Sequence, residues 1–106
     1  MTVNEMREWV QQAASRLSDA NVAAVFAQGP RLGAARGSSW ISLTSPSGAA
    51  RFVRDPDGSG HCQAMRHRDG VAVVDERHSA VDEGHLDALV VLLTRPARPI
   101  AGRTSR

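Results

Sequence analysis

Three short turns constrain the fold of this chain more than any other feature, because each one separates two runs with the composition of β-strands. The turns lie at 45–48, 55–60 and 68–70, and they are rich in Asp, Gly, Pro and Ser, the residues that turns favour. Connections this short join antiparallel neighbours, since a parallel pair needs a crossover of a dozen or more residues. The sequence therefore predicts four consecutive antiparallel strands at 40–44, 49–54, 61–68 and 71–77.

Regular elements are also predicted on both sides of these four strands. Residues 3–18 place apolar side chains at spacings of three and four, and Thr2 and Glu5 are positioned to form a capping box in front of them. An apolar strand is predicted at 22–28, with both of its faces buried. A closing helix is predicted to begin near Ser79 or Asp82 and to run to Pro96, with acidic residues near its start.

This order of elements predicts an α+β fold. It consists of an N-terminal helix, a five-stranded antiparallel meander and a C-terminal helix, with both helices on one face of the sheet. The chain has 106 residues, 42% of them hydrophobic, which suits one domain, and we place that domain at 1–94. Residues 95–106 contain two prolines, four arginines and no apolar period, so we expect a disordered tail.

The distribution of charge argues against a nucleic-acid-binding domain. The 13 basic residues are all arginine and the net charge is +2, but the four arginines of the tail account for the excess. Residues 1–94 carry 9 arginines and 11 acidic residues, a net charge of −2, whereas nucleic-acid binding needs basic residues clustered on a folded face. A role as a nucleic-acid accessory protein would have to act through the basic tail.

Neither export nor membrane insertion is predicted. The first residues contain Glu5 and Glu8 where a signal peptide would have an apolar run. The longest apolar run, at 89–93, is far shorter than the roughly 18 residues of a membrane span. The single cysteine, Cys62, cannot close an intramolecular disulfide, and a cytoplasmic location is therefore expected.

Three histidines near the 68–70 turn, His61, His67 and His78, are the candidate metal ligands, with Cys62 beside the first. If the turn has two residues, His61 and His78 face each other on one side of the sheet. If it has three, with Gly70 as a bulge, they lie on opposite faces. Since no Cys-x-x-Cys or His-x-x-x-His spacing supports a closed site, we predict no bound metal.

Other catalytic and cofactor motifs are incomplete. The 55–60 segment resembles the start of an EF-hand calcium loop, but Arg66 occupies the twelfth position, where a bidentate Glu is required. Cys62 directly follows His61 on a strand, so the two side chains point to opposite faces and cannot form a catalytic pair. No Gly-x-Ser-x-Gly elbow is present. We therefore predict no cofactor and favour a non-enzymatic role.

The sheet face opposite the helices is the predicted binding surface. Trp40 alternates away from Ile41 and Leu43, and exposed Trp beside Arg is typical of binding hot spots. An equally weighted alternative packs Trp40 beneath the preceding loop. The candidate binding residues are Trp40, Arg31, Arg36 and Arg51.

The favoured hypothesis is a small non-enzymatic protein-binding module that presents its sheet or an edge strand to a protein partner or to a second copy, as in a homodimer. Small secretion chaperones and toxin-immunity proteins use a similar outline, which is an analogy of fold alone. The first alternative is a metal- or ligand-dependent enzyme that uses the hairpin histidines with Asp75 or Glu76. The second is the nucleic-acid accessory role of the tail.

Overall fold

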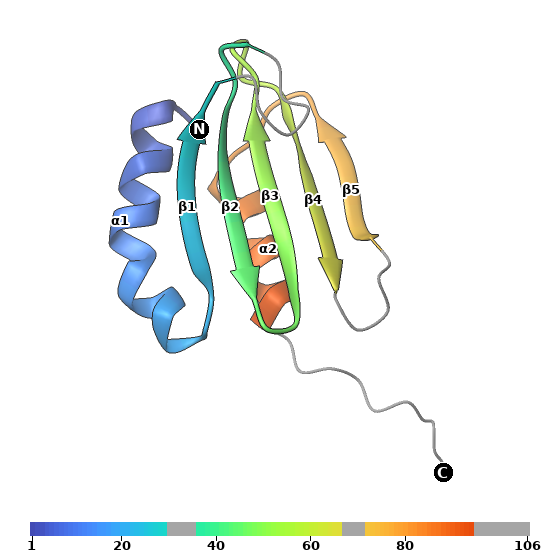
Figure 1. Ribbon diagram of the computed structural model, residues 1–106. Helices are drawn as coiled ribbons and strands as arrows, with labels where there is room; N and C mark the ends of the chain where they lie inside the picture. The colour runs from blue at the N-terminus through green and yellow to red at the C-terminus, as the bar shows by residue number, and fades with distance from the viewer. Residues whose placement is uncertain (30–35, 67–71, 95–106) are drawn as a thin grey trace.

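The computed structural model describes residues 1–29, 36–66 and 72–94 (Figure 1). The predicted tail, Arg31 and His67 lie outside these ranges. The elements are α1 (Val3–Asp19), β1 (Ala23–Gln28), β2 (Ser39–Ser45), β3 (Gly48–Arg54), β4 (Gly60–Arg66), β5 (Ala72–His78) and α2 (Glu83–Thr94). This order confirms the predicted α+β fold, and of the two predicted starts of the last helix, Ser79 and Asp82, the structure agrees with Asp82.

The five strands form one antiparallel sheet in the order β1-β2-β3-β4-β5, so each strand pairs with its neighbour in the chain. Figure 1 shows α2 behind the middle strands and α1 alongside β1. Alternate strand residues join the helices in a single core, which Phe52 occupies at its centre with no exposed surface. Both helices therefore cover the same face, and within the described ranges no helix lies on the other face of the sheet.

The sequence signals that start and orient the two helices act as predicted. The Glu5 amide donates to Thr2 Oγ1 at 3.1 Å and the Thr2 amide donates to Glu5 Oε1 at 2.7 Å, which completes the capping box. These hydrogen bonds lower the pKa of the Glu5 carboxyl. At the start of α2, Asp82 Oδ1 accepts a hydrogen bond from the His85 amide at 3.3 Å. The buried helix residues are Met6, Trp9, Ala13, Leu17, Leu86, Leu89, Val90 and Leu93.

The prediction that the first strand is buried on both faces is wrong. Strand β1 lies at the edge of the sheet, where only β2 pairs with it. Ala24 and Phe26 turn toward the helices and are half-buried, whereas Val25 points to the other face and is 60% exposed. The apolar composition of this segment favours burial on both faces, although an edge strand has a neighbouring strand on one side alone.

The β4–β5 hairpin contains one irregularity. Its register shifts between Ala64 and Met65, after which the strands pair with an offset of one residue. Before the shift, at the start of β4, His61 lies opposite Arg77 and Gly60 lies opposite His78. Because facing residues share a side of the sheet, the shift decides which face each histidine occupies.

Candidate functional site

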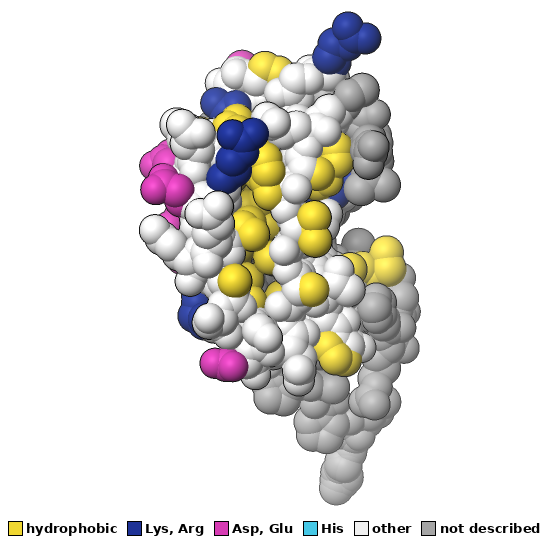
Figure 2. All heavy atoms as spheres, turned by 60° about the vertical axis from the view of Figure 1, so that its left-hand side comes forward, with side chains coloured by type: hydrophobic (Ala, Val, Ile, Leu, Met, Phe, Trp, Pro, Cys, Tyr) yellow, Lys and Arg dark blue, Asp and Glu magenta, His cyan; other side chains and the backbone are white. Residues whose placement is uncertain are grey.

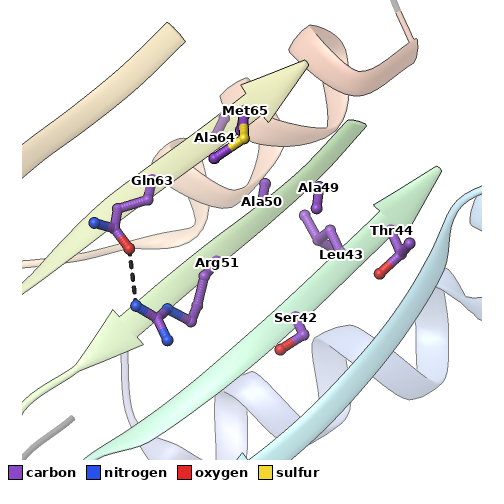
Figure 3. A pocket seen from close by; sticks show the side chains of 9 residues that line it. All are labelled: Ser42, Leu43, Thr44, Ala49, Ala50, Arg51, Gln63, Ala64 and Met65. Carbon is purple, nitrogen blue, oxygen red and sulfur yellow. Dashed lines mark hydrogen bonds between the residues drawn. The ribbon is translucent and has the colours of Figure 1, made fainter. Parts of the chain in front are cut away.

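The uncovered face of the sheet carries a shallow, open hollow of about 380 Å³ over β2, β3 and β4 (Figure 3). Residues from all three strands line it: Ser42, Leu43, Thr44, Ala49, Ala50, Arg51, Gln63, Ala64 and Met65. We call this surface the open-face hollow. The surface is recessed at its centre because the alanine and serine side chains there are too small to fill the space.

The open-face hollow has a polar end and an apolar end, as Figure 3 shows. At the polar end Arg51 Nη2 donates to Gln63 Oε1 at 2.9 Å, across the directly paired strands β3 and β4. At the apolar end Met65 lies opposite Ala49 and is 46% exposed. A flexible thioether next to an oriented guanidinium suits a surface that must accept another molecule's apolar and polar groups together.

Trp40 occupies the predicted face but is not exposed on it. It lies between Ala27 on β1 and Val53 on β3, away from the core under the helices. Its side chain is only 3% exposed, and that of Val53 is fully buried. This burial favours the alternative in which Trp40 packs rather than docks. Of the four candidate binding residues, Arg51 lines the hollow, Trp40 is buried, Arg36 is exposed in a turn and Arg31 lies outside the described ranges.

Two of the histidines proposed as metal ligands, His61 and His78, do not come together. His61 lies on the face away from the helices and His78 on the helix-covered face. The bulged alternative predicts these opposite faces, but the observed register shift lies between Ala64 and Met65, and Gly70 and His67 lie outside the described residues. Among the residues that the structure describes, no group of three or more His, Cys, Asp and Glu side chains is arranged to hold a metal ion. The geometry of the described hairpin therefore gives no support to the metal-dependent enzyme.

The 55–60 segment uses its carboxylates to build a turn. The Asp55 amide donates to the Ser59 carbonyl at 2.7 Å, and Asp55 Oδ1 accepts from Ser38 Oγ at 2.9 Å. Asp57 Oδ1 accepts from the Ser59 amide and hydroxyl at 3.0 and 2.6 Å, and these bonds lower the pKa of Asp57. Because one oxygen of each acid already has protein partners, Ser38 for Asp55 and Ser59 for Asp57, the segment serves as the β3–β4 connection, as its Asp and Gly content indicates.

A second cluster, which the sequence analysis did not foresee, lies under α2. Cys62, Glu76, His78 and His85 line a recess of about 210 Å³, with the two imidazole rings 4.0 Å apart. His78 Nε2 lies 3.7 Å from a Glu76 carboxylate oxygen. The proximity of His85 to His78 and Cys62 does not follow from the sequence, because only the packing of α2 on the sheet brings His85 close to β4 and β5.

The chemistry of this recess is limited by its cysteine. Burial, with the nearby Glu76 charge second, raises the pKa of Cys62 from 9.0 to about 11. The thiol is 2% exposed and stays protonated at neutral pH. Since the thiolate is the nucleophilic and metal-binding form, Cys62 acts as a packing residue here.

The raised pKa of Cys62 predicts a loss of stability in alkali. A group whose pKa is higher in the folded state stabilises the fold below its unfolded pKa, and that contribution disappears as the pH rises through the folded value. The chain has no lysine and no tyrosine, so Cys62 is the side chain expected to titrate between pH 9 and 11. We expect the free energy of unfolding to fall by about 1–2 kcal/mol over this range in urea melts. Cys62→Ala should have a flat profile, and an equal fall in that variant would contradict the assignment.

Comparison of the chain with protein-family models, with curated proteins and with solved structures gave no match. None of the helices in the described ranges is long and apolar enough to cross a bilayer. The open-face hollow is therefore interpreted from its own geometry.

Proposed function

We propose that this chain is a small, non-enzymatic protein-binding module that presents the open-face hollow to a protein partner. The observation that carries the proposal is the cover of the sheet by helices on one face, which leaves Met65 46% exposed on the other face at one end of the hollow, with the half-buried Arg51 at the opposite end. Methionine and arginine are both enriched in protein interfaces. Self-association through the same face, giving a homodimer, is the simplest form of this function, and a cytoplasmic location belongs to the same proposal.

The shape of the surface also supports a protein as the ligand. The hollow is open and shallow, whereas sites for small molecules are concave and enclose most of the ligand. Its lining residues come from three adjacent strands, so a flat partner surface can contact all three strands at once. The paired Arg51 and Gln63 side chains give such a contact an oriented polar group at one end.

An arginine placed in the hollow tests this function. Thr44 is exposed and lines the hollow, so Thr44→Arg should block the surface while leaving the core intact. Gln11→Arg on the exposed side of α1 adds the same charge elsewhere and serves as the matched control. We expect sedimentation velocity, and affinity purification from the native host, to show an association at least about tenfold weaker in Thr44→Arg and unchanged in Gln11→Arg. An association that both variants retain would overturn the proposal, as would a wild-type protein that is monomeric and copurifies with nothing.

A further inference from the structure

The two edges of the sheet differ in their protection against pairing with another strand. Sheet edges are normally blocked by charged residues, prolines or bulges. The sequence of β5 contains Asp75, Glu76 and Arg77, and a register shift interrupts its pairing with β4. Strand β1 contains no charged residue and no proline, and its register with β2 runs through all six residues without a shift. The sequence and register of β1 therefore provide no charge, proline or bulge that would prevent strand addition.

The backbone of β1 provides the groups that strand addition needs. The Gly29 amide donates to the Ser38 carbonyl at 3.1 Å, which marks this pair as hydrogen-bonded. Because hydrogen-bonded and non-bonded pairs alternate in an antiparallel ladder, Ala24, Phe26 and Gln28 direct their N–H and C=O groups away from β2. In the described ranges no strand pairs with this outer side.

A groove next to this edge can take the side chains of an added strand. It has a volume of about 580 Å³ and lies at the start of β1, which contributes Ala23 and Ala24, between α1, which contributes Val10 and Ala14, and the end of β2 with its turn, which contribute Thr44, Ser45 and Pro46. Figure 2 brings the α1 side of the molecule forward and shows hydrophobic side chains in a band along it. Val25, 60% exposed, supplies an apolar contact on the opposite face of the strand. An added segment would thus meet apolar surface on both of its faces.

The position of α1 excludes a second copy of the chain from this edge. Arg7 of α1 lies over the Phe26 ring, 5.1 Å from its centroid, and Figure 1 shows the helix running beside β1. Two copies joined edge to edge would have their β1 strands about 4.8 Å apart, and each would bring the helix that runs beside its own β1. The two helices would then compete for the space beside the joined strands, since packed helices need about 8–10 Å between their axes. A single extended segment brings no helix and meets no such conflict.

The guanidinium of Arg7 lies at one end of the β1 edge. Arg7 Nη2 donates to Gln28 Oε1 at 3.1 Å, which holds the guanidinium at the last residue of β1. An acidic side chain in the added segment would be favoured there by charge.

We propose that β1 accepts an extended segment of a partner protein as a sixth strand. The segment alternates apolar and small polar residues, and it carries an acidic residue at the end nearest Gln28. Backbone hydrogen bonds supply the affinity, and the groove beside α1 supplies the side-chain preference. The inference rests on the proposed function in one respect, that the partner is a protein, and it names the part of that partner which binds.

The test uses the full chain and a synthetic probe. The probe is an acetylated heptapeptide with valine at alternate positions, serine between them and one terminal glutamate. A matched peptide has methyl groups on alternate backbone nitrogens, which removes the donors that would face β1. We expect wild-type protein to bind the first peptide in calorimetry and the methylated peptide at least about tenfold more weakly. Hydrogen exchange should show new protection of the Ala24, Phe26 and Gln28 amides.

Variants of the edge complete the test. Ala24→Pro removes one outward N–H and should weaken binding at least about tenfold. Val25→Lys places a charge at the edge and should weaken binding without removing a backbone donor, so it remains informative if the proline variant does not fold. Val91→Lys, at a 55% exposed position on α2, is the matched control and should bind like wild type.

The inference is wrong if wild-type protein does not bind the unmethylated peptide. It is also wrong if Val25→Lys and a folded Ala24→Pro bind it as wild type does. Met65→Arg separates this result from the proposed function, because Met65 lines the hollow and does not line the groove beside α1, whereas Thr44 lines both. Loss of partner association in Met65→Arg alone would retain the hollow as the binding surface and remove the edge, whereas loss in Ala24→Pro alone would do the reverse.

Discussion

Replacing Trp40 with alanine should lower the free energy of unfolding by about 3–5 kcal/mol, the range measured when large buried aromatic residues are truncated. The side chain is 3% exposed, and its cross-strand neighbour Val53 is completely buried, so truncation leaves a cavity on the uncovered face. Urea denaturation followed by circular dichroism measures the change. Thr44→Ala is the control, since Thr44 is exposed on the same face of the same strand and its truncation should stay within about 0.5 kcal/mol.

The same variant separates the two interpretations of Trp40. If Trp40 were a binding anchor, its loss would cost little stability and would weaken association by about 2 kcal/mol or more. A loss of stability below about 1 kcal/mol, together with reduced association in sedimentation, would therefore contradict the packing role. Burial in the monomer leads us to expect the opposite result.

Gly60→Ala should destabilise the protein by about 3 kcal/mol or more, the upper part of the range for overpacked positions. Gly60 is the first residue of β4, and a Cβ atom there would collide with the Val53 carbonyl oxygen and lie 2.9 Å from the carbonyl carbon. Backbone atoms cannot rotate away as a side chain can, so β3 and β4 would have to separate at this point.

Gly58→Ala, two residues earlier, provides the comparison. Gly58 has φ +92° but open space around its Cα, so alanine suffers backbone strain without a collision, at a cost of about 1–2 kcal/mol. Thermal melts of both variants measure the difference. Equal losses would show that conformation, rather than contact with β3, requires glycine at 60.

Most of the fold follows from local signals in the sequence. The capping box at Thr2 and Glu5 begins α1 at the predicted residue, and the turns at 45–48 and 55–60 separate the strands where expected, while the predicted turn at 68–70 lies outside the described residues. The exposure of one face of β1 does not follow from its composition, because its position at the edge depends on which strands pair beside it. A run of alanine, valine and phenylalanine has the same composition in either position, so periodicity alone could not distinguish them.

The candidate site was predictable in part. Simple alternation along β2 and β3 places Arg51 on the face away from Ile41, and the structure confirms it there. The pairing of Arg51 with Gln63 depends on how many residues the 55–60 turn consumes, which turn composition does not fix. The separation of His61 from His78 depends in the same way on the register shift in β4 and β5. Register is set by the packing of whole strands, which local patterns do not contain.

The strand order has a consequence for how the chain folds. Each strand after β1 pairs with the one before it in sequence, so the sheet can assemble by closing one hairpin after another, the longest connection being residues 29–38 between β1 and β2. The cover over the middle strands is α2, which contains the last residues of the core. A chain emerging from the ribosome therefore makes its sheet before the helix that shields Phe52 exists. Until Leu93 emerges, the apolar side of the nascent sheet is the surface that a chaperone would meet.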